Sequence, residues 1–144
     1  MRKLLSIVLP LLVLVFVAGC GDPKVTGKVM FPDGTPLTTG QVMFQKEGFV
    51  GSGSIKKDGT YSAGKTKDGD GLPPGTYQVF LSEVTTFGEL SGTEGVQTAT
   101  GSAIFEVAPS VNLVAQKYMS PSTSGWTVKV DGPTKFDIEV EPPQ

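Results

Sequence analysis

The stretch Pro73-Pro-Gly-Thr-Tyr-Gln-Val-Phe-Leu-Ser82 decides the fold class of this chain. Within it, Tyr77, Val79 and Leu81 recur at every second position, so an extended backbone places them on one face. The preceding Pro-Pro-Gly is typical of a turn that starts a strand. The stretch therefore predicts a β-strand over residues 76–82, with one face turned toward a core.

The same alternation extends toward the amino terminus. In residues 24–31, Val25, Val29 and Phe31 share a face, and Gly27 lies on that face as well. A glycine on the inward face of a strand indicates that another backbone packs closely there. A second strand is expected over residues 41–45, with Val42 and Phe44 facing together.

Two hairpins are predicted from their turns. Residues 52–57 and 60–63 flank Asp58-Gly59, a strong two-residue hairpin signal. Residues 126–130 and 135–140 flank Asp131-Gly-Pro133 and are expected to form the last hairpin. Its inward side chains are expected to be Trp126, Val128, Val130, Phe136, Ile138 and Val140. A further strand is expected over 102–107, and a short helical turn within 112–118.

Glycine and proline account for 30 of the 144 residues, far above the usual share of about 12 %. Such a composition favours many short elements joined by turns. We therefore expect an all-β fold, a seven- to eight-stranded antiparallel Greek-key β-sandwich over residues 25–141.

The amino-terminal segment is typical of an export signal. Arg2 and Lys3 precede an apolar run over residues 4–18 that is shorter than the roughly 20 residues a membrane span needs. The following tetrad Val17-Ala-Gly-Cys20 resembles the lipobox of bacterial lipoprotein precursors. The resemblance implies cleavage between Gly19 and Cys20 and a diacylglyceryl thioether on Cys20. The alternatives are an ordinary cleaved signal with an incidental cysteine, and an uncleaved anchor.

This interpretation divides the chain into a lipoprotein signal peptide (1–19), a lipidated tether (20–24) and the sandwich domain (25–141). It predicts a lipid-anchored protein of the bacterial cell envelope, attached to a membrane through Cys20 and facing the periplasm or exterior. Without its signal the chain has 10 basic and 14 acidic residues, which argues against nucleic acid and anionic headgroups as partners. Histidine is absent from the sequence, and with it the commonest general base and metal ligand.

Four pieces of the domain, in their order, resemble carboxypeptidase regulatory-like, transthyretin-related β-sandwich domains. They are Val25-Thr-Gly-Lys-Val29, Asp33-Gly-Thr-Pro-Leu37, Asp58-Gly-Thr-Tyr61 and Leu72-Pro-Pro-Gly-Thr-Tyr-Gln-Val79. The carboxyl-terminal part, with Lys117-Tyr118, Ser122-Thr-Ser-Gly125 and Phe136-Asp-Ile-Glu-Val140, is similar to the tail of small secreted bacterial lipoproteins that carry such a domain. The resemblance implies a seven-stranded accessory, non-catalytic module. Hydroxyisourate hydrolases of the transthyretin type rely on histidines, so their activity is not implied.

Two short motifs match catalytic patterns by letter. Residues 59–66 fit the phosphate-binding pattern G-x-x-x-x-G-K-[ST], but a hairpin precedes them and a Gly/Pro-rich loop follows, where that site needs a strand and then a helix. Ser54 and Lys57 fit S-x-x-K, whose chemistry needs both side chains on one helical face. On a strand the two point apart. We expect neither a nucleotide nor any other cofactor to be bound, and no catalytic residue is assigned.

Two binding alternatives remain open from the sequence. Asp68 and Asp70, with Asp58 nearby, offer carboxylate oxygens to a calcium ion, although no bidentate glutamate follows at EF-hand spacing. Trp126 and Tyr118 offer an aromatic platform for a sugar, although Trp126 also fits the core.

The sequence thus predicts a non-enzymatic structural or binding module. The alternatives are an accessory domain that binds a carbohydrate or an envelope protein at a loop end formed by residues 64–71 and 86–101, and an enzyme with an unrecognised site.

Overall fold

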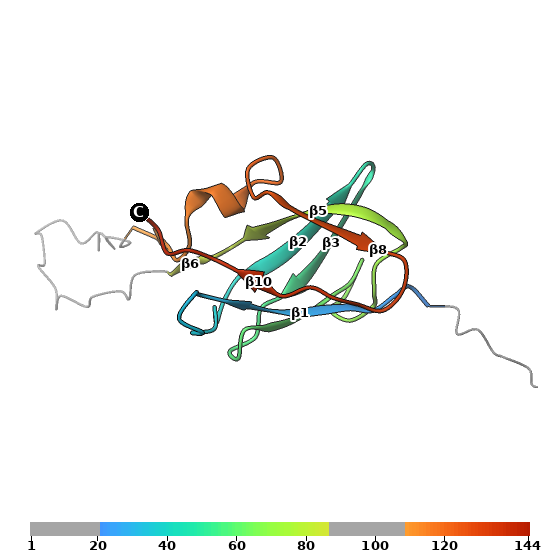
Figure 1. Cartoon of the computed structure of the whole chain (residues 1–144), viewed down its shortest axis with the longest axis horizontal. Helices are drawn as coiled ribbons and strands as arrows, with labels where there is room; N and C mark the ends of the chain where they lie inside the picture. The colour runs from blue at the N-terminus through green and yellow to red at the C-terminus, as the bar shows by residue number, and fades with distance from the viewer. Residues whose placement is uncertain (1–20, 87–108) are drawn as a thin grey trace, which may run out of the picture.

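Two β-sheets lie face to face in a computed structural model that describes residues 21–86 and 109–144 (Figure 1). The first sheet has four antiparallel strands, and β5 lies inside it between β2 and β8. In spatial order these strands are β3 (Phe49–Ser54), β2 (Gln41–Lys46), β5 (Gly75–Ser82) and β8 (Trp126–Val130).

The second sheet is built around β1 (Val25–Met30). On one side β1 pairs antiparallel with β4 (Thr60–Ala63). On the other side it pairs in parallel with β9 (Thr134–Lys135) and β10 (Ile138–Glu139), two pieces of one carboxyl-terminal segment. The predicted all-β sandwich is therefore confirmed, but the carboxyl-terminal segment pairs with β1 in parallel and not antiparallel as predicted.

Three small elements complete the described fold. β6 (Thr85–Thr86) and β7 (Val111–Asn112) form a two-stranded ribbon. A 3-10 helix, η1 (Gln116–Met119), lies within the range where a helical turn is predicted. In the described part of the chain no helix has the length and apolarity to cross a bilayer. The signal peptide, Cys20 and the predicted strand 102–107 lie outside the described residues.

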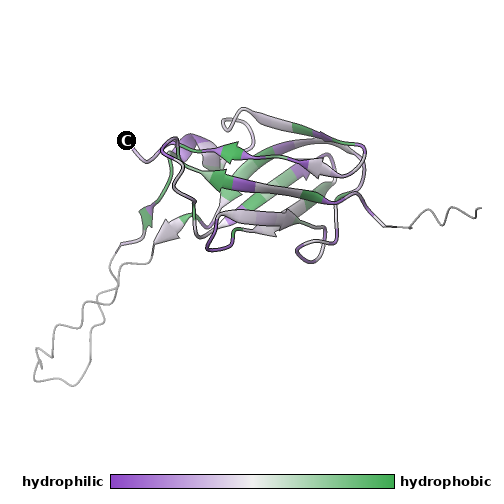
Figure 2. Cartoon of the chain, turned by 60° about the horizontal axis from the view of Figure 1, so that its bottom comes forward, coloured by the Kyte–Doolittle hydropathy of each residue, from purple (hydrophilic) through white to green (hydrophobic). Residues whose placement is uncertain are grey.

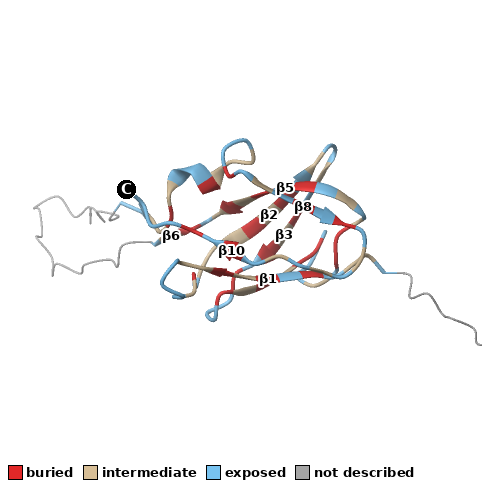
Figure 3. Cartoon of the chain, in the orientation of Figure 1, coloured by how far each residue is buried: buried red, intermediate tan, exposed pale blue. Residues whose placement is uncertain are grey.

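The core fills the space between the sheets (Figure 3). Apolar and polar residues alternate along the strands (Figure 2), so each sheet turns its apolar face inward. The Phe44 ring lies 6.0 Å from that of Tyr61 and 6.3 Å from that of Tyr77, which links the two sheets through aromatic contacts. Tyr77 also donates its hydroxyl to the carbonyl of Pro73 at 2.6 Å, which fixes the start of β5.

The predicted Asp58-Gly59 turn forms, and an antiparallel bridge between Ser52 and Gly64 joins its two arms, but the arms do not pair as a continuous hairpin ladder. Lys56 N–H donates to the Thr60 carbonyl, and Gly59 has the positive φ that such a turn requires. The turn carries the chain from β3 in the first sheet to β4 in the second. The hairpin partner of β3 is β2, and their tight connection is at Glu47-Gly48, a signal that the sequence interpretation missed.

The predicted last hairpin is wrong. After β8, residues 131–133 cross to the other sheet, where β9 and β10 run parallel to β1. Gly27 explains this arrangement, since a Cβ there would overlap the Phe136 carbonyl oxygen. The Tyr61 hydroxyl donates to that same oxygen at 2.5 Å. The predicted close approach at Gly27 is confirmed, and its partner is the carboxyl-terminal segment.

Candidate functional site

The two ends of the sandwich are built differently (Figure 1). Gly21–Lys24 lead into β1 at one end, called here the tether end. The 3-10 helix η1, the ribbon β6–β7 and the carboxyl-terminal residues gather at the other, called the far end.

The tether end is held by the loop over residues 64–72. Leu72 N–H donates to the Pro23 carbonyl at 3.0 Å, and Lys24 Nζ donates to the Gly69 carbonyl. Lys65 forms an ion pair with Asp22 at 3.0 Å. These contacts hold residues 22–24 against the body of the domain.

At the far end, Tyr118 and Trp126 stack with their ring centroids 4.5 Å apart and their planes 3° apart. Tyr118 is buried and Trp126 is half-buried. The buried Ser124 hydroxyl donates to the Val79 carbonyl at 2.5 Å and holds the loop between them against β5. The aromatic pair considered as an alternative sugar platform is thus a stack beside η1 in which Tyr118 is buried and Trp126 packs against the core, as its place in the alternation also allowed.

Two open hollows lie on either side of η1, with volumes of about 370 and 470 Å³. Both are lined by Gln116 and Lys117. Lys117 Nζ binds Glu141 at 2.7 Å and lies 4.8 Å from the centre of the Tyr118 ring. The hydrogen bond to Glu141, followed by that to Tyr118, raises the pKa of the Lys117 ammonium above its ordinary value. A paired, exposed ammonium is a polar contact point at the rim of these hollows.

The carboxylates considered for calcium do not converge. Both Asp68 carboxylate oxygens accept from the Ser54 N–H at 3.2 Å, and Asp70 accepts from the Lys67 N–H at 3.1 Å. Asp58 accepts from Thr60 in its own turn, and this bonding holds the pKa of Asp58 below its usual range. Within residues 21–86 and 109–144, no group of three or more possible ligands is placed to hold a metal ion.

The two catalytic-looking motifs lie in the wrong elements for their chemistry. Residues 59–66 form β4 and the turn after it, and no helix begins behind Gly64 to hold a phosphate. Ser54 ends β3 and Lys57 lies in the following turn, so the helical turn that would align them is not formed.

Of the loop end considered as an alternative, formed by residues 64–71 and 86–101, the described parts start at opposite ends of β5. The first loop precedes β5 and contacts the tether residues, while Thr86 follows β5 and pairs with Val111 at the far end. The length of an eight-residue strand, about 26 Å, separates the two starting points. Residues 87–101 themselves lie outside the described part.

The fold and this site define a small all-β sandwich domain with open hollows at one end. No protein-family model matches the chain, and neither does any curated protein. It is similar to the crystal structure of a DUF3823 family protein from Bacteroides ovatus ATCC 8483, with 18 % identity and a TM-score of 0.44 over 84 % of this chain and 45 % of that one. A DUF3823 family protein from Parabacteroides merdae ATCC 43184 gives 20 % identity and a TM-score of 0.40, over 85 % and 47 % of the two chains. This chain thus spans about half the length of both proteins.

Proposed function

We propose that this protein is a lipid-anchored, non-catalytic β-sandwich of the bacterial cell envelope that acts as a structural or binding module. The anchor would be a diacylglyceryl group on Cys20, after cleavage behind Gly19. The lipobox tetrad and the apolar leader support this assignment. The order of the sequence motifs further supports a carboxypeptidase regulatory-like module.

The observation that carries the proposal is the fixed path of residues 21–24. Because Pro23 and Lys24 are bonded to the loop over residues 64–72, residues 22–24 lie against the tether end of the sandwich. A lipid on Cys20 would hold the domain by its tether end. The far end would then point away from the membrane and the outer sheet faces would turn sideways, where a partner could reach both.

A structural or binding role draws on the ordered body of the domain. The buried side-chain polar atoms of residues 21–86 and 109–144 all have hydrogen-bond partners, so they stabilise one packing of the sandwich. Lys117 and Glu141, which line a hollow beside η1, form an ion pair with each other. A binding or structural role requires only an ordered surface, which the sandwich provides.

Labelling with radioactive palmitate tests the anchor. Wild-type protein and Cys20→Ser are expressed in a bacterial host, and Gly21→Ala serves as a matched control because a Cβ at position 21 meets no atom within 4 Å. The wild type and the control should label and sediment with membranes, whereas Cys20→Ser should do neither. A wild type that takes up no label would refute lipid anchoring.

A further inference from the structure

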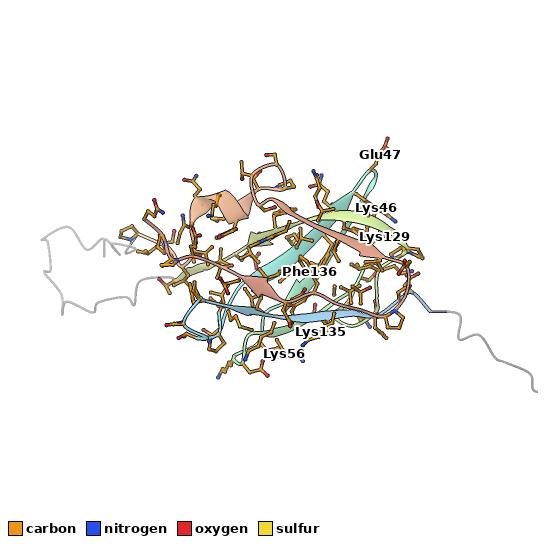
Figure 4. All side chains as sticks on the ribbon, viewed as in Figure 1. Lys46, Glu47, Lys56, Lys129, Lys135 and Phe136 are labelled. Carbon is orange, nitrogen blue, oxygen red and sulfur yellow. The ribbon has the colours of Figure 1, made fainter. Side chains whose placement is uncertain are left out.

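The outer faces of the two sheets differ in charge. On the second sheet the outward side chains of β1 and of residues 134–139 include four charged groups: Lys28, Lys135, Asp137 and Glu139. Lys135 and Asp137 form an ion pair at 3.0 Å. The four strands of the first sheet are fully described. Among their outward residues, Lys129 of β8 is the one charged side chain. Figure 4 shows Lys129 and Lys135 on strands of opposite sheets.

The uncharged face, defined by the outward residues of β3, β2 and β5 together with Thr127 of β8, is ordered in rows by the strand register. Its middle row joins Ser52, Met43 and Phe80. Met43 and Phe80 are half-buried, and neither belongs to the residues packed against the core. An aromatic ring and a thioether therefore lie side by side at the centre of an outward surface.

Hydrogen-bonding groups flank this apolar centre. One neighbouring row joins Val50, Gln45, Gln78 and Thr127, and Val50 is 52 % exposed. The row on the other side joins Ser54, Gln41 and Ser82, and there the Gln41 amide already donates to Glu83 at the margin. Amides and hydroxyls both donate and accept, so the face offers neutral donors and acceptors around an aromatic ring.

We propose that the uncharged face binds a neutral polysaccharide. A sugar chain without carboxylates or sulfates presents hydroxyls to the amide rows and an apolar ring face to Phe80. A neutral face and a neutral sugar chain are complementary because neither has to bury an unpaired charge when they bind. This inference names a ligand class for the binding role proposed above and rests on that role.

The composition of the face favours a sugar over a second copy of this chain. Interfaces of stable homodimers are about 65 % apolar in area. Here Val50, Met43 and Phe80 are the apolar members among the outward residues of the four strands, and the others are amides, hydroxyls and Lys129. A face with this balance would leave many polar groups unpaired in a dry dimer interface.

Electrophoresis of the full chain through native gels that contain detergent and a dissolved polysaccharide tests the proposal. The probes are starch and a neutral β-glucan, with anionic alginate as the charged comparison. The variants are Phe80→Ala and the double variant Gln45→Ala/Gln78→Ala, whose two glutamines are exposed. Met30→Ala is the matched control, because Met30 is a half-buried outward residue on the other sheet.

At least one neutral polysaccharide should retard the wild type and the Met30→Ala control, and alginate should not. Phe80→Ala should weaken retardation about threefold to tenfold, the range expected for loss of one aromatic contact. The double variant, which leaves the core untouched, should weaken it as well. Migration unaffected by both neutral probes, equal retardation of all variants, or retardation by alginate alone would overturn the proposal.

A dimer by light scattering that Phe80→Ala dissociates, without retardation by a sugar, would instead assign the face to self-association and would also overturn it. Palmitate labelling at Cys20 is independent of every one of these outcomes. Failure of the glycan proposal is therefore distinguishable from failure of the lipid anchor.

Discussion

The two sheets of the sandwich are held together in different ways. The first is a continuous antiparallel ladder in which β2 and β5 pair over five positions, and its strands follow the sequence alternation. The second depends on a carboxyl-terminal segment that pairs with β1 in two short pieces. Gly27 and Tyr61 hold that segment by contacts between residues more than 70 positions apart. The strands of the first sheet thus follow their own local alternation, whereas the second sheet also depends on contacts between residues more than 70 positions apart.

The largest expected effect is on both sheets together. Phe44 is fully buried, and its ring contacts Tyr61 of the second sheet and Tyr77 of the first. Phe44→Ala should lower the free energy of unfolding by about 3–5 kcal/mol. Chemical denaturation measures this loss. A loss below about 1 kcal/mol would show that the aromatic contact does not join the sheets.

Gly27→Ala should affect the second sheet first. The new Cβ would overlap the Phe136 carbonyl oxygen and would lie 2.8 Å from the Tyr61 hydroxyl oxygen. We expect a loss of about 3 kcal/mol, the upper part of the range for overpacking. Amides of residues 134–140 should lose hydrogen-exchange protection more than those of β2 and β5.

Gly132→Ala is the matched control for that variant, because a Cβ there meets no atom within 4 Å and Gly132 has no positive φ. Its stability should stay within about 0.5 kcal/mol of the wild type. Equal losses of unfolding free energy in the two variants would contradict the claim that the carboxyl-terminal segment packs against Gly27.

Tyr61→Phe should weaken the same contact less. It removes the hydroxyl that donates to Phe136 and should cost about 1–3 kcal/mol at neutral pH. Burial, and secondarily Asp137, raises the pKa of Tyr61 above its ordinary value. Stability from the neutral hydroxyl is thus present below about pH 10 and is lost as pH rises, because the unfolded chain ionises first. Denaturation between pH 8 and 11 should show this slope in the wild type and a flatter one in the variant.

The smallest effect concerns the turn that carries the chain between the sheets. The hydrogen bonds from Thr60 hold the pKa of Asp58 below its usual range. The stability that this carboxylate adds is therefore present above about pH 4 and is lost as pH falls through its lowered folded value. Asp58→Asn keeps an acceptor oxygen without the charge, so its unfolding should depend less on pH between 6 and 2. The same pH dependence of stability in both proteins would contradict a stabilising role for the Asp58 carboxylate.

Much of the first sheet is readable from sequence, because alternation reports a half-buried strand directly. Val42 with Phe44 and Tyr77 with Val79 were predicted inward, and all four are buried. The Asp58-Gly59 turn and the close approach at Gly27 were also predicted correctly. The inward faces and the turn depend on residues close in the chain, where side-chain period and turn chemistry decide the conformation.

The strand partners across the second sheet were not predictable in the same way. Asp131-Gly-Pro133 resembles a hairpin connection, but the next residues leave β8 and join β1 in parallel. The carbonyl oxygen that packs against Gly27 and accepts from the Tyr61 hydroxyl belongs to Phe136. No local sequence pattern identifies Phe136 as that partner. Likewise residues 64–71 and Thr86, which belong to the two loops considered as one binding end, precede and follow the same strand. The uncharged outer face becomes visible only once the register aligns Gln45 with Gln78.

Mass spectrometry of the amino-terminal peptide of membrane-derived protein tests the anchored-module account most directly. The account predicts that the mature chain begins at Cys20 and carries a diacylglyceryl thioether on its sulfur. An amino terminus at Met1, or a mature chain whose Cys20 is a free thiol, would contradict it.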